Sequence, residues 1–291
     1  MGNKRSRACY TLAMASSRAP GDGADRPAHH SSHGGYVYVA RSRRSGGLSL
    51  GVDLTPHGHC SFSCIYCQAS HPCGAQPDLR VDLDRLRDDL LAQLESPHAT
   101  ELRDLVLAGS GEPSGAVGFP EALALIEQVC RRCGFDRPRR VFTNGRHLRS
   151  DAVSAALARW IDSGGEAWFK LDGASDEVLR AINGREIDAR SHLAAIWAFA
   201  RERGIGIQSM LVQGEGLPDV DGVVAGIIEE IATAVASGAK VTAVHLLTLA
   251  RRPSDEDQAA RLRAIPAQRL EEFASMLRTR TRLPVSVYGA T

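Results

Sequence analysis

Two hydrophobic patterns alternate along most of this chain. Short runs of aliphatic and β-branched residues are followed by a turn and then by a segment with apolar residues every three or four positions. The runs predict buried strands, and the segments predict amphipathic helices. The predicted strands are residues 36–40, 48–54, 104–109, 140–143, 167–171, 206–212, 240–249 and 285–288. The predicted helices are residues 81–95, 120–133, 151–162, 176–182, 192–203, 220–236 and 267–280.

The order of these elements predicts the fold class. From residue 48, a strand, a loop and a helical segment repeat six times. Strands that alternate with helices at this spacing are typical of a parallel sheet with helices outside it, so we expect an α/β fold. Six units are fewer than the eight that close a barrel. Because an open parallel sheet binds ligands at the carboxyl ends of its strands, candidate chemistry is expected there.

Three cysteines lie within eight residues after the first strand of this repeat. Cys60, Cys64 and Cys67 are separated by three residues and then by two. This spacing suits a metal site better than disulfides, because thiolates on one short loop can point at one centre. Iron–sulfur clusters are normally held by four cysteines, so three would leave one iron of a [4Fe-4S] cluster open. The alternative is a chance group of small apolar residues.

The cysteine motif resembles the signature of the radical S-adenosylmethionine (SAM) superfamily, including Tyr66 just before the last cysteine. Residues 47–56, which lead into Cys60, and Gln68, which follows the motif, resemble a narrower group, the wyosine-synthase-like radical SAM proteins. The likeness extends from about residue 36 to residue 288. It implies a partial, TIM-like (β/α)6 barrel with a parallel sheet and outer helices. It also implies that the three cysteines are both metal ligands and catalytic residues, and that Tyr66 lies at the cofactor site.

The resemblance implies a specific chemistry. A [4Fe-4S] cluster would bind the amine and carboxylate of SAM through its open iron. An electron from a flavodoxin-like or ferredoxin-like donor would then cleave SAM to a 5′-deoxyadenosyl radical, which abstracts hydrogen from a substrate. In such an enzyme the cofactor carries the difficult chemistry and the protein positions it.

Residues at the end of the second repeat strand are candidate SAM contacts. Gly109, Ser110, Gly111 and Glu112 precede a proline there. The resemblance implies that this stretch contacts the amine of SAM. Glycines let a backbone approach a ligand closely, and carbonyl or carboxylate oxygens accept from an ammonium group. The alternative is a plain turn.

Further candidates follow the next strands. Asn144 ends the third strand and either bonds the SAM carboxylate or ribose or belongs to a turn. Lys170 and Asp172 end the fourth, in a chain with three lysines and 32 arginines. Lys170 either pairs with Asp172, binds the SAM carboxylate or contacts substrate. The resemblance suggests that the fifth strand, with Gln208, lies along the ribose and adenine.

Other polar residues have competing interpretations. Arg251 and Arg252 follow the sixth strand, where guanidinium groups either bind an anion or belong to a solvated loop. His245, on an apolar strand, is more typical of a packed core residue than of an acid or base. Cys130 and Cys133 end an outer helix, and Cys73 follows the motif. They lack a compact fourth partner, so we do not expect a second cluster.

Charge is unevenly distributed along the 291 residues, whose formal net charge is +1. Residues 1–44 carry eight Lys and Arg against two Asp and Glu, which leaves 27 against 32, a net of −5, for the rest. Residues 1–35, with His29, His30 and His33, predict a disordered basic tail rather than a transit peptide or metal site. Residues 36–291 predict one core domain.

Composition narrows the location. Hydrophobic residues make up 43% of the chain and charged residues 24%, and no apolar run approaches the roughly 20 residues that span a membrane. Seven cysteines without a secretory signal peptide indicate a reducing compartment, so we expect a cytoplasmic protein with no membrane partner.

The substrate is open at this point. A tRNA-binding enzyme usually has a basic face, which the acidic body lacks, so a small-molecule or peptide substrate is favoured over a tRNA base. A third hypothesis is a non-enzymatic iron–sulfur electron carrier or sensor. It explains the cysteines but not the glycine-rich turn or the six repeated units.

Overall fold

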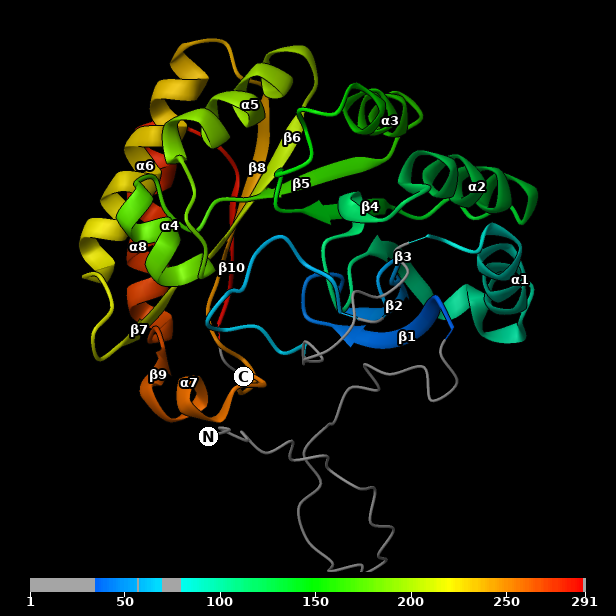
Figure 1. Ribbon diagram of the computed structural model, residues 1–291, viewed down its shortest axis with the longest axis horizontal. Helices are drawn as coiled ribbons and strands as arrows, with labels where there is room; N and C mark the ends of the chain where they lie inside the picture. The colour runs from blue at the N-terminus through cyan, green and yellow to red at the C-terminus, as the bar shows by residue number, and fades with distance from the viewer. Residues whose placement is uncertain (1–34, 57, 70–79, 290–291) are drawn as a thin grey trace, which may run out of the picture.

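The computed structural model describes residues 35–56, 58–69 and 80–289. Eight strands form one sheet in the order β1-β2-β3-β4-β5-β6-β8-β10. The sheet is curled, and helices cover its outer face (Figure 1). The strands are β1 (Val37–Ser42), β2 (Gly47–Val52), β3 (Leu102–Leu107), β4 (Arg139–Thr143), β5 (Glu166–Lys170), β6 (Ile205–Met210), β8 (Val241–Leu247) and β10 (Val285–Tyr288).

All neighbouring strands from β2 to β10 run parallel, whereas β1 pairs antiparallel with β2. In the described part of the chain, β1 and β10 end the sheet and do not pair with each other. The sheet is therefore an open half-barrel. This confirms the predicted fold class, a partial TIM-like α/β barrel with outer helices. Six strands match the predicted repeat, and β1 and β10 extend it at the two edges.

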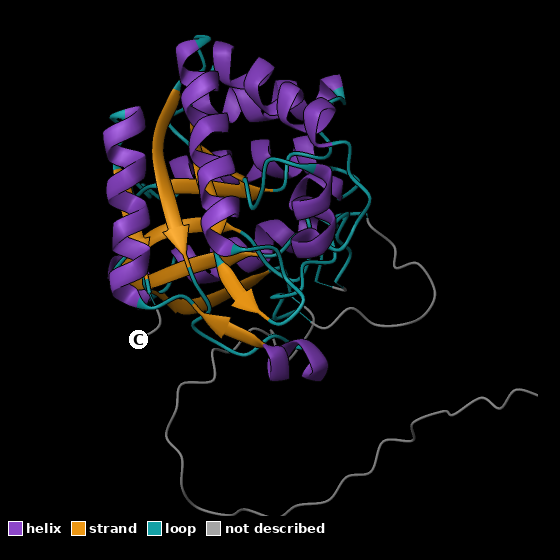
Figure 2. Cartoon of the chain, turned by 90° about the vertical axis from the view of Figure 1, so that its left-hand side faces the viewer, coloured by secondary structure: helices purple, strands orange, loops and turns teal. Residues whose placement is uncertain are grey.

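Long helices stand along the outside of the strands, as the side view shows (Figure 2). They begin and end within three residues of the predicted bounds, and the predicted segments 151–162 and 220–236 coincide with α3 and α6. The helices are α1 (Leu83–Leu94), α2 (Phe119–Arg132), α3 (Asp151–Asp162), α4 (Asp176–Asn183), α5 (Ala189–Glu202), α6 (Val220–Ala236), α7 (Glu256–Arg261) and α8 (Ala267–Thr281), with short 3₁₀ turns at Pro97–Glu101 and Pro113–Gly115.

The main core lies between the outer face of the sheet and the helices. Leu50, Leu105, Phe169 and Val244 come from four different strands and are fully buried in it. Their neighbours along each strand point to the inside of the curve, because successive side chains of a strand alternate between faces. The half-barrel thus has an apolar convex face and a separate concave face.

One predicted strand is divided between two elements in the structure. Residues 206–212 divide into β6, which ends at Met210, and β7 (Val212–Gly214). The latter pairs antiparallel with β9 (Leu262–Ala264), which the sequence analysis missed together with α7. Buried Thr248 explains the change of direction. Its hydroxyl donates to the Leu211 carbonyl (2.8 Å) and accepts from the Ile265 amide (2.7 Å), which ties both segments beside the sheet.

Some predictions lie outside the described residues. These are the disordered tail, of which only residue 35 is described, and any role for Cys73. Within the described residues, no helix has both the length and the apolarity needed to cross a bilayer.

Candidate functional site

The cysteine loop follows β2 and lies on the inside of the curved sheet, next to α4 (Figure 1). Its backbone is bonded to the last turn of α4. The Ser63 amide donates to the Asn183 carbonyl (2.8 Å), and the Ile65 amide donates to the Ile182 carbonyl (3.0 Å). Helix-end carbonyls need such partners. Gly184 ends the helix with φ +64°, and a Cβ there would lie 2.3 Å from the Ser63 oxygen.

The loop is also fastened at both ends. Before the first cysteine, the His59 carbonyl accepts from the Glu112 amide (2.9 Å), and a Cβ on Gly111 would lie 1.9 Å from that carbonyl oxygen. At the last cysteine, the Cys67 carbonyl accepts from the Ser254 amide (2.8 Å). The structure therefore brings the cysteine loop against the glycine-rich segment after β3 and the segment after β8.

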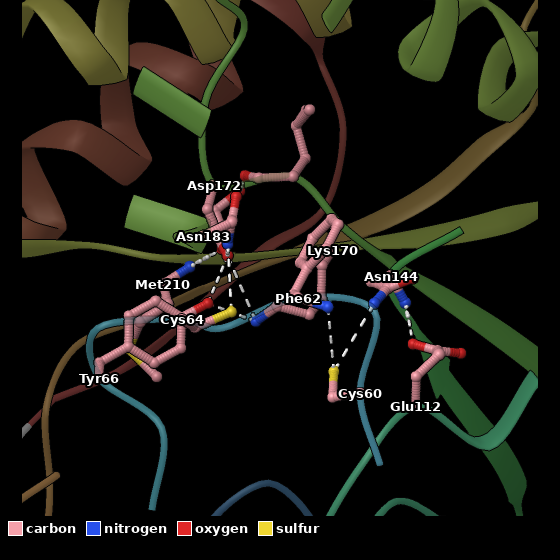
Figure 3. Close-up of polar contacts among 12 residues, drawn as sticks. Cys60, Phe62, Cys64, Tyr66, Glu112, Asn144, Lys170, Asp172, Asn183 and Met210 are labelled. Atoms are coloured by element: carbon pink, nitrogen blue, oxygen red, sulfur yellow. Dashed lines mark hydrogen bonds and ion pairs between the residues drawn. The ribbon is translucent and has the colours of Figure 1, made fainter. Parts of the chain in front are cut away.

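The first two sulfur atoms receive N–H groups (Figure 3). Cys60 Sγ accepts from the Phe62 amide at 3.4 Å and faces Asn144 Nδ2 at 3.9 Å. Cys64 Sγ accepts from Asn183 Nδ2 at 3.3 Å. Hydrogen bonds of this kind stabilise thiolates and tune the potential of iron–sulfur clusters.

Burial opposes ionisation of these thiols. It raises the pKa of Cys60 to about 12, and it raises the pKa of Cys64 although the Lys170 ammonium acts in the other direction. These two thiols are protonated at neutral pH unless a cation is bound, since a metal deprotonates a coordinating thiol.

The donor set fits an iron–sulfur cluster in its chemistry. Cys60, Cys64 and Cys67 are free thiols on one loop, and two of them receive N–H donors. In the described ranges, however, no three His, Cys, Asp or Glu side chains are gathered closely enough to hold a single metal ion. That absence concerns a single ion, whereas the thiolate ligands of a four-iron cluster bind different irons and need not converge on one point.

A buried carboxylate, Asp172, organises the opposite side of the loop. It is 2% exposed. It accepts from the Tyr66 hydroxyl, from Asn183 Nδ2 (2.8 Å) and from the Met210 amide (2.9 Å). Lys170 Nζ lies 3.3 Å from the same carboxylate. One side chain thus joins the cysteine loop, α4 and the end of β6 (Figure 3).

Lys170 is held inside the protein by this group. Its ammonium donates to the Tyr66 hydroxyl (2.5 Å) and lies 4.8 Å from the centre of that ring. Burial is the largest single influence on the pKa of Lys170 and lowers it, but the charge and hydrogen bond of Asp172 together with the charges of Cys64 and Cys60 raise the pKa overall. Of the predicted alternatives for Lys170, the structure shows the pairing with Asp172, and a contact with SAM stays a prediction.

Glu112 turns its carboxylate toward β4. It accepts from the Thr143 hydroxyl (2.6 Å), the Ser114 hydroxyl (2.6 Å) and the Asn144 amide (2.7 Å). Asn144 in turn donates its side-chain amide to Ser61 (3.0 Å). These bonds occupy much of the Glu112 carboxylate and join the turns after β3 and β4 to the cysteine loop. A SAM contact by either residue remains a prediction.

Two polar atoms on the concave wall near the middle of the sheet have no hydrogen-bond partner in the part of the chain that the structure describes. The Trp168 ring stacks on His245 with 3.8 Å between centroids. These buried atoms are His245 Nδ1 and Gln208 Nε2, and the two residues are neighbours across β6 and β8. Burial, and then the charges of Arg44 and Arg140, lower the pKa of His245 to about 4, so it is neutral at pH 7.

Three residues considered in the sequence do not join this site. Cys130 is buried in the main core, and Cys133 packs against that core. Both lie at the end of α2 that leads into β4, at the amino edge of the sheet. Arg252 is exposed and lies 3.5 Å from Glu256.

Two residues of the site were missed. Asn183 bonds both Cys64 and Asp172. Asp53, at the end of β2, accepts from the amides of Thr55 (2.9 Å) and Ser110 (2.8 Å), so it fixes the glycine-rich segment from the other side. Asn183 before Gly184 is a helix-end signal, but that signal does not reveal which loop the helix end contacts.

No protein-family model matches the chain. A protein named GTPase Obg from Brachyspira hyodysenteriae is 31% identical over 135 residues, which are 43% of this chain and 18% of that protein. The UPF0026 protein slr1464 from Synechocystis sp. is 28% identical over 172 residues, 57% of this chain and 61% of that protein. The chain thus matches less than two thirds of the length of either curated relative.

A solved structure supports the fold. TYW1 with a lysine-pyruvate adduct bound has a TM-score of 0.52 to this chain, with 14% identity over 80% of this chain and 74% of that one. At this identity the likeness establishes a shared half-barrel architecture and nothing about substrate.

Proposed function

We propose that this protein is a radical SAM enzyme that acts on a small-molecule or peptide substrate. One observation carries the proposal. The loop with Cys60, Cys64 and Cys67 is fastened inside the half-barrel to the ends of β3, β8 and α4, where ligands of open parallel sheets bind. The resemblance of the cysteine motif and the shared architecture with TYW1 support it.

The three cysteines would hold a [4Fe-4S] cluster with one open iron. When bound, such a cluster supplies the electron that cleaves SAM reductively to a 5′-deoxyadenosyl radical, which then takes hydrogen from the substrate. The electron would come from a flavodoxin-like or ferredoxin-like donor. Asn144 and Asn183 direct N–H groups at two of the sulfurs.

The protein residues position the parts. Asp172, Tyr66 and Lys170 hold one side of the cysteine loop, and Glu112 holds the turn after β3. This leaves the backbone of Gly109–Gly111 as the candidate acceptor for the SAM amine. Gln208, with its unpartnered amide, is a candidate contact for the ribose or adenine.

The proposal is tested anaerobically with the full chain. After reconstitution with iron and sulfide, dithionite and SAM are added, and 5′-deoxyadenosine is measured by mass spectrometry. We expect the wild type to form it. Cys64→Ala removes a ligand, so it should lose both the cluster absorption and at least about 1,000-fold of the product. Cys133→Ala, in a half-buried cysteine outside the site, is the matched control and should retain both.

Retained SAM cleavage in Cys60→Ala, Cys64→Ala or Cys67→Ala would contradict the proposal. A cluster that forms without SAM binding in a titration would favour an electron carrier instead. A gel shift with tRNA tests the other enzymatic alternative, in which the substrate is a tRNA base.

A further inference from the structure

A cavity of about 260 Å³ opens between the two edges of the half-barrel. Its walls come from β1 and β2 on one side, and from the ends of β8 and β10 on the other. Figure 1 shows β1 and β10 facing each other across the inside of the curve. The volume lies just below the usual range for ligand pockets, so it suits a small molecule or one end of a larger one.

The cavity is strongly basic. Arg41, Arg43, Arg44 and Arg251 line it, and no Asp or Glu is among the described residues that do so. Residues 45–291 as a whole carry a net charge of −5. Positive charge is therefore concentrated at this cavity, although residues 45–291 are negatively charged overall. Guanidinium groups bind phosphate and carboxylate oxygens bidentately.

Arg44 is the most informative of these side chains. It reaches from the β1–β2 turn to the concave wall, where its Cζ lies 4.2 Å from the centre of the Phe142 ring. Asp104 is the acid whose charge acts on it. That carboxylate is already bonded to Arg140 Nη1 (2.7 Å) and to the Ser49 hydroxyl.

Arg44 therefore lacks a carboxylate of its own in the described part of the chain. Burial lowers the pKa of Arg44, which reflects the cost of placing a charge there. Arg44 is partly buried, and an oxyanion in the cavity would supply the anionic partner that its guanidinium lacks among the described residues. Burial and the like charge of Arg251 also lower the pKa of Arg43, and an anion bound near both guanidinium groups would offset their repulsion.

The cavity adjoins the cysteine loop. Gln68, which directly follows Cys67, lines it, and so does Gly109, the first residue of the predicted SAM segment. Tyr288 lines the same cavity and contacts the edge of the His245 ring, with 5.0 Å between centroids. A ligand whose anionic end lies at Arg44 would thus have its remainder beside the proposed cofactor site.

We propose that this cavity binds the oxyanionic group, a phosphate or a carboxylate, of a small-molecule substrate, with Arg44 as the principal anion-binding residue. The identification of the ligand as the substrate rests on the proposed radical SAM function. Anion binding itself does not depend on it.

The test is a binding titration of the full chain, before and after cluster reconstitution, with inorganic phosphate and separately with succinate. Chloride at equal ionic strength is the reference. We expect one of the two probes to bind. Arg44→Gln should weaken its binding at least about tenfold, because a charge-assisted hydrogen bond to a buried anion is lost. Arg44→Lys, which keeps the charge without the bidentate geometry, should bind with intermediate affinity.

Arg201→Gln is the matched control, since Arg201 is exposed near the end of α5, at the amino edge of the sheet, and it should bind like the wild type. Circular dichroism checks that each variant is folded, and if Arg44→Gln is not, Arg44→Lys decides. No binding of either probe beyond the chloride reference, or equal affinity in wild type and the folded Arg44 variant, would overturn the proposal. Tight tRNA binding that depends on Arg44 would overturn the small-molecule assignment. Failure to assemble a cluster contradicts the enzyme proposal and leaves the anion measurement intact.

Discussion

The two faces of the curved sheet are built from alternate residues of the same strands, yet their side chains differ in polarity and in the interactions that they make. On β6, Ile207 is fully buried in the convex core, whereas the buried side-chain amide nitrogen of its neighbour Gln208 has no hydrogen-bond partner among the described residues. On β5, Phe169 packs in the same core, whereas Lys170 is bound into a charged group beside the cysteine loop. The convex face contributes stability through packing, and the concave face carries buried polar and charged groups.

The largest stability effect is expected at the mouth of the concave face. Asp172→Ala leaves Lys170 buried without its carboxylate and releases Tyr66 and Asn183. Breaking a buried pair in this way costs about 3 to 5 kcal/mol of unfolding free energy, measured by urea denaturation. Asp162→Ala, which removes an exposed carboxylate near Arg203, should cost less than about 1 kcal/mol. If the two variants lost similar amounts of unfolding free energy, the Lys170–Asp172 pair would be no more important for stability than an exposed ion pair.

A smaller effect is expected from pH on the concave wall. The pKa of His245 is lowered to about 4 by burial and then by Arg44 and Arg140, so the unfolded chain binds its proton more readily. The contribution of neutral His245 to the unfolding free energy is fully present above about pH 6.5 and is lost as the pH falls toward 4. The loss should be about 2 kcal/mol after allowance for solvent screening. The difference in unfolding free energy between wild type and His245→Gln should shrink over this window. A difference independent of pH would contradict the assignment.

The smallest effect separates neighbouring residues of one strand. Gln208→Leu removes a buried amide that lacks a partner, so it should raise the unfolding free energy by about 1 kcal/mol. Ile207→Val on the opposite face is its counterpart and should lower it by about 1 kcal/mol through a small cavity. Urea denaturation of both variants checks the signs. A destabilised Gln208→Leu would mean that this face depends on its polar atoms for stability.

Much of the fold was predictable because local periodicity is strong. The predicted segments 151–162 and 220–236 coincide with α3 and α6, since each has a clear apolar face and an acidic residue near its start. β7 and β9 were missed because each has three residues, and because their pairing depends on Thr248, which no local pattern reveals.

The sequence motifs of the site were predictable, but the long-range contacts between its residues were not. The cysteine spacing and the turns after the strands marked candidate residues, and parallel strand ends meet at one edge. Asn183 was missed because its contact with Cys64 spans 119 residues of sequence. In the sequence, Arg44 is only one of the eight Lys and Arg residues of segment 1–44. Its position over Phe142 depends on the curvature of the whole sheet.

That long-range contact has a consequence for biosynthesis. The cysteine motif leaves the ribosome early, but the α4 residue that holds Cys64 follows 119 residues later. At a synthesis rate of about 5 to 20 residues per second, roughly 6 to 24 s pass between the synthesis of Cys64 and that of Asn183, which then can contact it. During this interval the three thiols are open to oxidants and to stray metal ions. We therefore expect that a cluster enters the fastened loop only after the fourth repeat has been translated.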